Sequence, residues 1–257
     1  MRIGVCTSPE KVTSPVADLE YIESPVASAL CPLEDDSAFE ARLAAAKAAP
    51  APVEAANCFI PTELKTTGPQ VDPAAVDAYV TTAMRRAKRV GISTIVFGSG
   101  GSRKVPEGFS IADAQEQIVA HLKRWGPIAG RFGVTIAIEP LNKAECNIIN
   151  SVDEGAELAR RADHPNIRLL ADTYHMARDG QGPEQIRRAQ GLMAHVHCAE
   201  GDGRGPLGTK GEDQRPYFKA LKDIGYKGRV SIEARWEDFA SQLPPAVVEL
   251  QRQIQEA

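Results

Sequence analysis

This chain of 257 residues lacks a long apolar run, a surplus of basic residues and a leader-like start. No run reaches the roughly 18 apolar residues that cross a membrane. The opening MRIGVCTSPE has no basic stretch followed by an apolar core, so it does not resemble a signal peptide. A net charge of -4 with a pI near 5.8 gives no basic surface for nucleic acid. We therefore expect no membrane or nucleic-acid partner and a cytoplasmic location.

Cysteine is also scarce, and its placement excludes common structural uses. The five cysteines form no CxxC pair and show no repeated spacing. A disulfide framework or a structural zinc site would need such spacing. We predict that the cysteines are reduced thiols and that none of them joins the functional site.

The chain does contain a regular alternation of short β-branched runs and longer helical patterns. Eight runs have the length and composition of buried strands, and their largely apolar character is typical of a parallel sheet covered by helices. The candidate strands are residues 2–7, 21–26, 52–59, 94–99, 135–140, 167–174, 193–200 and 229–236.

Several of the intervening helices have readable ends. Asp72 before a proline predicts a helix start, and Gly91 predicts the end of that helix. Ser151 with a glutamate three residues later predicts a capping box. Ser110 precedes another helical pattern, a further one covers 213–225, and we place the first helix within 11–20.

These alternations predict an α/β fold, a single (β/α)8 TIM barrel in one domain over residues 1–257. The length is typical of this barrel, which has its active face at the carboxyl ends of the strands. No GxGxxG follows the first strand, so an open dinucleotide-binding sheet is disfavoured.

Four polar residues end the last four candidate strands. Glu139, Asp172, His197 and Glu233 stand at the ends of runs that are otherwise apolar. In a barrel these side chains can converge on one ion. Three carboxylates and one imidazole favour Mn²⁺, Mg²⁺ or Co²⁺, with Zn²⁺ less favoured.

Other polar residues near these strand ends are candidates for supporting roles. His195 lies two residues before His197 on the same side of the strand, where we expect it to pack behind the site. His175 follows the sixth strand and is placed to contact a substrate oxygen or to shuttle a proton. Glu145 could fold back from its loop, and Arg204 in a glycine-rich loop could grip oxygen atoms.

One basic, glycine-rich loop is a candidate site for a second ligand, a phosphate group. GSGGSRKVPEGF follows the fourth strand and could bind a phosphate, but it lacks the P-loop spacing GxxxxGK[ST]. Trp236, just beyond the eighth strand, is suited either to walling the pocket or to packing in the core.

The segments EPLNKAE, LADTYHM, HVHCAEGDGRGPLG and SIEARW resemble the sugar phosphate isomerase/epimerase family, whose fold is a xylose isomerase-like TIM barrel. The most similar members are ketose 3-epimerases and hydroxypyruvate isomerases. The resemblance is sharpest between residues 133 and 238. The family places an arginine six residues after the ligand histidine, whereas Gly203 occupies that position here and Arg204 comes next.

The resemblance implies a metal-dependent isomerase or epimerase of a keto sugar or related keto-acid, acting through an enediolate. It implies that Glu139, Asp172, His197 and Glu233 bind the metal and that Glu139 and Glu233 also form the acid/base pair. Glu145, His175 and Arg204 would bind the substrate; these seven residues are the candidate site. The resemblance also implies a homodimer or homotetramer, because family members often assemble in this way.

Other functions remain open from the sequence. A lyase, either a dehydratase or a decarboxylase acting on a keto-sugar, keto-cyclitol or keto-acid, could use the same metal site. A non-catalytic binder of sugar or metal would need no proton transfer. DNA repair of the endonuclease IV type is disfavoured, because it needs more histidines and a basic surface.

Overall fold

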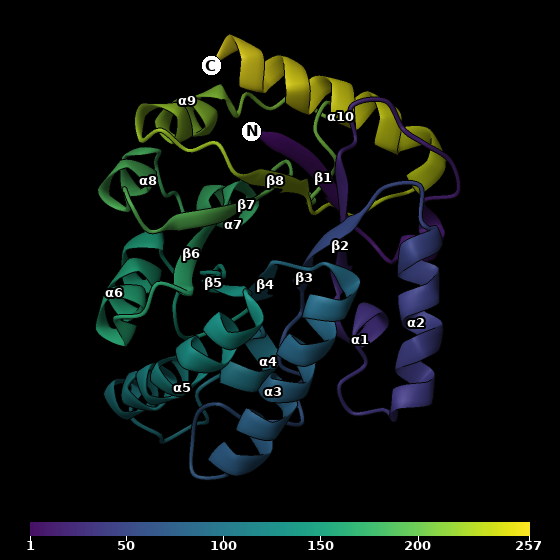
Figure 1. The fold of residues 1–257 in the computed structure, drawn as a ribbon. Coiled ribbons are helices and arrows are strands. Elements are labelled where there is room, and N and C mark those ends of the chain that lie inside the picture. Colours follow the sequence, from purple (N-terminus) through teal and green to yellow (C-terminus); the bar gives the residue numbers. More distant parts are fainter.

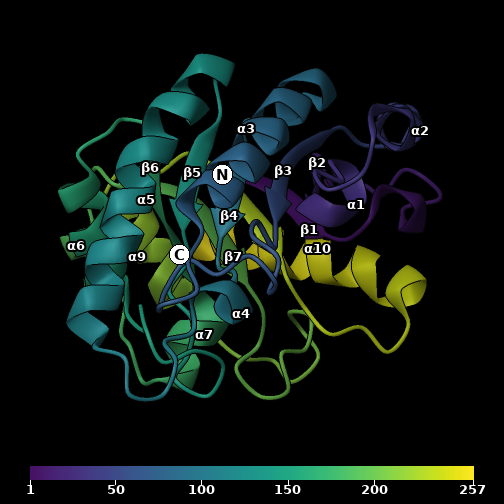
Figure 2. The same cartoon turned by 90° about the horizontal axis from the view of Figure 1, so that it is seen from below.

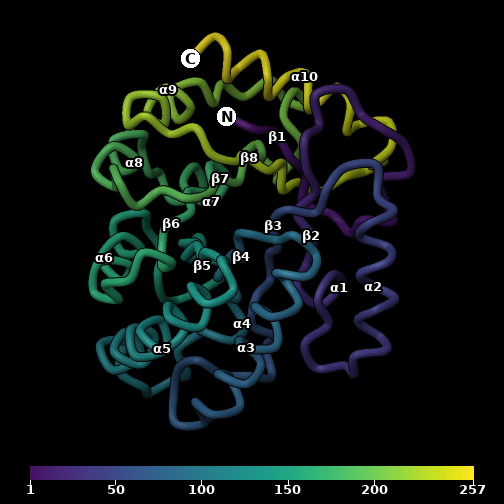
Figure 3. The backbone as a smooth tube through the Cα atoms, viewed as in Figure 1, coloured from purple at the N-terminus to yellow at the C-terminus, as the bar shows by residue number.

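The computed structural model describes residues 1–257, and its eight strands close into one parallel barrel. Strand β1 pairs with β8 as well as with β2, so the sheet has no free edge. Figure 3 shows the chain travelling once around this ring, so that its first and last strands lie side by side. The strands are β1 (Arg2–Cys6), β2 (Tyr21–Pro25), β3 (Val53–Asn57), β4 (Thr94–Phe97), β5 (Thr135–Ile138), β6 (Ile167–Asp172), β7 (Met193–Cys198) and β8 (Arg229–Ile232).

Helices surround the ring of strands (Figure 1), which confirms the predicted TIM barrel. The helices α3 and α5 lie side by side along its outside (Figure 2). None of the helices combines the length and apolar character that crossing a bilayer requires. The helices are α1 (Val26–Ala29), α2 (Asp36–Ala48), α3 (Pro73–Val90), α4 (Gly100–Arg103), α5 (Ile111–Phe132), α6 (Val152–Ala162), α7 (Thr173–Arg178), α8 (Glu184–Arg188), α9 (Arg215–Asp223) and α10 (Phe239–Glu256).

The predicted helix ends agree with the structure where the sequence supplied a cap. The side chain of Asp72 accepts hydrogen bonds from the first turn of α3, and Gly91 ends that helix at φ +103°. Ser151 caps α6 by accepting from the amide of Glu154. The Glu154 carboxylate accepts from Asn150 instead of Ser151, so the capping box is displaced by one residue.

The helix predicted within 11–20 is wrong. The connection between β1 and β2 holds only the 3-10 turn η1 (Pro9–Lys11). Pro15 lies in the middle of this segment and supplies no amide for a helical hydrogen bond. Asp18 has φ +61°, which also ends any regular helix.

The barrel interior is apolar on one side and polar on the other. Val96, Ala137 and Leu170 form a small buried apolar cluster. Arg229 and Arg2 form ion pairs with Glu54 near the amino ends of their strands. This network closes one end of the barrel, which leaves the carboxyl ends of the strands for the site.

Candidate metal centre

The four strand-end residues come together at the carboxyl end of the barrel. Glu139 follows β5, Asp172 ends β6, His197 lies near the end of β7 and Glu233 follows β8. One ligand atom from each lies within 4.8 Å of the others. Residues separated by up to 94 positions in the sequence (139 to 233) therefore share one small space.

The electrostatics of this cluster suit a cation. The Nδ1 atom of His197 is 3.1 Å from an oxygen of Glu139 and 3.1 Å from an oxygen of Glu233. Burial alone would lower the pKa of His197, but the surrounding carboxylates, Glu23 foremost, raise it well above its usual value. Burial opposes ionisation of Glu233, yet His197 and Arg204 outweigh burial and lower its pKa to about 2. The donor set and its negative charge fit a divalent ion with mainly oxygen ligands.

Glu139 is held firmly by its surroundings. Arg103 is fully buried and donates to the carbonyl oxygens of Glu139 (2.7 Å) and Phe97 (2.8 Å), the residues at the ends of β5 and β4. Gly98 packs against the Glu139 carboxylate so closely that a Cβ at this glycine would lie 2.1 Å from Oε2. The arginine of the glycine-rich loop thus supports the backbone of the site.

His175 and its neighbours form a second group beside the cluster. The backbone amide of Asn142 donates to Nδ1 of His175, and its side-chain amide lies 2.8 Å from the same atom. Because Nδ1 accepts, the ring proton sits on Nε2. That Nε2 is buried without a hydrogen-bond partner, 3.5 Å from Asp172. It is therefore a free donor close to the candidate ligands, while Glu145 lies 4.0 Å from Nδ1.

A family model described as "Xylose isomerase-like TIM barrel" matches residues 17–256. The chain belongs to this family. The resemblance noted in the sequence is therefore confirmed.

Relatives within the family act on keto sugars or related compounds, according to their names. The L-ribulose 3-epimerase of Methylomonas sp. (strain DH-1) is 35% identical over 117 residues, covering 45% of this chain and 41% of the relative. The putative hydroxypyruvate isomerase of Homo sapiens is 28% identical over 160 residues, covering 59% of this chain and 57% of the relative. These matches span about two fifths to three fifths of the relatives' own lengths.

A solved structure shows the same fold over nearly the whole chain. The D-allulose 3-epimerase of Methylomonas sp., crystallised in complex with D-allulose, has a TM-score of 0.81 at 22% identity. The superposition covers 98% of this chain and 97% of the other. At this identity the likeness establishes the common architecture.

Arg204 reaches the site although it stands one position later in the sequence than the resemblance implies. Gly203 and Arg204 both have positive φ, +75° and +57°, so the backbone makes a left-handed turn directly at the arginine. The guanidinium pairs with Glu233 and lies 3.3 Å from Asp172. It also stacks 4.6 Å from the ring centre of Tyr174. Arg204 therefore occupies the mouth despite its shifted position in the sequence.

Three residues near the cluster were not foreseen. Asn57, at the end of β3, donates to the Glu233 carboxylate at 3.2 Å. Cys6, at the end of β1, lies 3.8 Å from Nε2 of His197, contrary to the expectation that no cysteine joins the site. Burial raises the pKa of the Cys6 thiol well above its usual value, and the nearby carboxylate of Glu23 raises it further. Glu23, on β2, lies behind His197 and also contacts His195.

Trp236 lies at the edge of this region. Its ring packs edge-on against Phe239, with centroids 5.2 Å apart, and its indole nitrogen has no partner. The residue is only partly buried. It packs on the start of α10 and is not one of the four candidate ligands.

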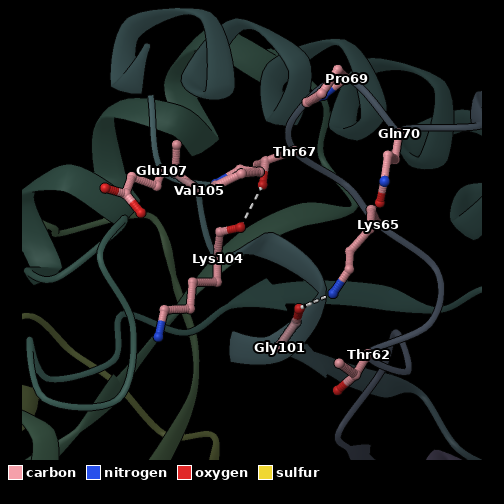
Figure 4. A pocket seen from close by; sticks show the side chains of 10 residues that line it. Thr62, Lys65, Thr67, Pro69, Gln70, Gly101, Lys104, Val105 and Glu107 are labelled. Carbon is pink, nitrogen blue, oxygen red and sulfur yellow. Dashed lines mark hydrogen bonds between the residues drawn. The ribbon is translucent and has the colours of Figure 1, made fainter. Parts of the chain in front are cut away.

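A separate cavity of about 560 Å³ lies between the loops that follow β3 and β4 (Figure 4). None of the four cluster residues lines it. Lys65 donates to the carbonyl of Gly101, and the Thr67 hydroxyl donates to the carbonyl of Lys104. These bonds join the loop after β3 to the loop after β4.

Proposed function

We propose that this protein is a divalent-metal-dependent isomerase or epimerase of a keto sugar or related keto-acid. Glu139, Asp172, His197 and Glu233 would hold one ion, with Mn²⁺, Mg²⁺ or Co²⁺ preferred. The observation that carries the proposal is the convergence of their ligand atoms within 4.8 Å. When bound, the ion supplies Lewis-acid polarisation of the substrate carbonyl and its neighbouring hydroxyl. The names of the family relatives support the substrate class.

Glu139 and Glu233 would move the proton. They follow strands on the two flanks of the ligand set, and each places an oxygen 3.1 Å from Nδ1 of His197. A substrate between them would show one face of its C–H carbon to each carboxyl group. One carboxylate takes the proton from that carbon, and the other group, in its acid form, returns a proton to the enediolate on the opposite face. This transfer inverts the carbon, as in an epimerase.

Glu145, His175 and Arg204 would orient the substrate. The Nε2–H of His175 has no partner within the protein and would donate to a substrate oxygen. Arg204 lies 3.9 Å from Glu145, so a donor and an acceptor stand side by side for adjacent substrate oxygens. Holding the C–H carbon in line with a carboxylate is a large part of what such contacts contribute to rate.

The test is proton exchange in D₂O over a panel of ketoses and hydroxypyruvate. The reaction runs with Mn²⁺ present, and a chelator then removes the ion before the NMR spectrum is recorded. We expect deuterium beside the carbonyl with no loss of water or CO₂, which a lyase would release. Glu139→Gln and Glu233→Gln should each slow exchange by at least about 100-fold with the fold intact, as for loss of a general acid or base.

The matched control is Glu184→Gln, the same change on an exposed residue of α8. It should exchange at the wild-type rate. Wild-type exchange in either Glu139→Gln or Glu233→Gln would refute the assigned pair, and binding of a ketose without any C–H exchange would identify a non-catalytic binder.

A further inference from the structure

We infer that Glu23 is a positioning residue for the metal, acting through His197. Glu23 lies on β2 with no exposed surface, inside the barrel behind the four candidate ligands. One of its oxygens is 2.8 Å from Nε2 of His197. The inference rests on the metal site of the proposed function and adds to it a residue that touches neither ion nor substrate.

The contact determines which ring nitrogen of His197 faces the cluster. An ionised carboxylate only accepts hydrogen bonds, so Nε2 must carry the proton in the Glu23 contact. Nδ1 is then the nitrogen with the free lone pair in a neutral ring. That atom is the one that lies 3.1 Å from the oxygens of both Glu139 and Glu233. The carboxylate thus turns the coordinating atom toward the ion, as outer partners of ligand histidines do.

Glu23 itself is fixed by a buried network on its other side. Its second oxygen accepts from the hydroxyl of Ser231 at 2.6 Å and lies 2.6 Å from Nε2 of His195. Because the Ser231 hydroxyl donates to Glu23, its lone pair is free for the Tyr21 hydroxyl, 2.8 Å away. Donors from β7 and β8 therefore hold both carboxylate oxygens, and the carboxylate cannot swing away from His197.

Space for this network is provided at one glycine. A Cβ at Gly4 would lie 2.3 Å from the ring of Tyr21, so only glycine lets that ring lie inside the barrel. The polar side of the interior is therefore built around the bond between Glu23 and His197. A purely structural role for Glu23 would affect stability alone, whereas a positioning role must also affect ion affinity.

The experiment is a calorimetric titration of Mn²⁺ into chelator-stripped protein, with melting of the metal-free protein measured beside it. We expect Glu23→Gln to weaken Mn²⁺ binding by about 10- to 100-fold, the range typical of outer partners of metal ligands. Glu54→Gln is the matched control, because Glu54 is a partly buried carboxylate on the neighbouring strand β3 that pairs with Arg2 and Arg229 away from the site. It should lower stability and leave the Mn²⁺ affinity unchanged.

A second variant keeps the test decisive if Glu23→Gln does not fold. Ser231→Ala removes one donor to Glu23 and should weaken Mn²⁺ binding, by less than Glu23→Gln does. Glu54→Gln should leave Mn²⁺ binding unchanged. Wild-type affinity in a folded Glu23→Gln variant, or in Ser231→Ala should Glu23→Gln not fold, would overturn the positioning role alone. Absence of Mn²⁺ binding by the wild-type protein would instead overturn the metal site, and with it this role.

Discussion

At the scale of single residues, Gly98 packs directly against the carboxylate of Glu139 and leaves no room for a side chain. Because a Cβ at Gly98 would lie 2.1 Å from Oε2, Gly98→Ala must displace that carboxylate. A displacement of about 1 Å can reduce a rate by about 100-fold. We therefore expect Gly98→Ala to lose at least about 100-fold in C–H exchange, measured by deuterium uptake, with a circular dichroism spectrum like that of the wild type.

Gly182→Ala is the control for that variant. A Cβ there would lie 2.3 Å from a carboxylate oxygen of Glu184, which is a clash similar to the one at Gly98. Glu184 is exposed, so its side chain can move away at little cost. Exchange at the wild-type rate is expected for Gly182→Ala. An equal loss in both variants would mean that the loss in Gly98→Ala does not come from displacement of the Glu139 carboxylate.

Some site residues were readable from sequence and others were not. Glu139 and Glu233 stand out because a carboxylate that ends an apolar strand serves no purpose in a core. Glu23 does not give this signal, because it lies in the middle of its candidate strand and its neighbour Ser24 is also polar. Asn57 and Asn142 gave none, because an asparagine at a strand end or in a loop is commonplace and its partners depend on the three-dimensional fold.

At the scale of elements, the loop from β7 to α9 depends on Glu200. This buried carboxylate accepts hydrogen bonds from the backbone amides of Gly208, Lys210 and Gly211 at 2.7–3.0 Å. The same loop carries Arg204 into the site. One ionised carboxylate thus ties three backbone amides of the loop together, and hydrogen bonds to a charged group are stronger than neutral ones, so removing Glu200 should loosen the whole loop.

We predict that Glu200→Ala accelerates amide hydrogen exchange over residues 201–213 and raises the KM for the accepted ketose, because Arg204 loses its support. Hydrogen-exchange mass spectrometry measures the first effect and steady-state kinetics the second. The exposed Glu184→Ala should change neither. Unaltered protection of the loop in Glu200→Ala would contradict this account.

The helices show where local sequence is sufficient. Caps such as Asp72 and Ser151 specify their helix starts because the side chain bonds directly to the first turn. Helix α10 was not foreseen, since its sequence contains Pro244 and Pro245 within the first turns. Packing of Leu243 and Leu250 against the core stabilises it instead, and such packing is not encoded locally.

At the scale of the whole molecule, barrel closure creates the site. The alternation of strands and helices predicts the barrel, and the barrel predicts that strand ends meet at one mouth. Sequence does not give the curvature of the wall or the turn at Gly203 that returns Arg204 to the mouth. Those features decide whether the polar ends converge, and they became visible only in the structure.

The central claim is that this convergence holds one divalent ion. The most direct measurement is anomalous diffraction from a crystal soaked in Mn²⁺. The account predicts a single strong peak bounded by Glu139, Asp172, Nδ1 of His197 and Glu233. A crystal with no peak between these side chains, or with the ion bound elsewhere, would contradict it.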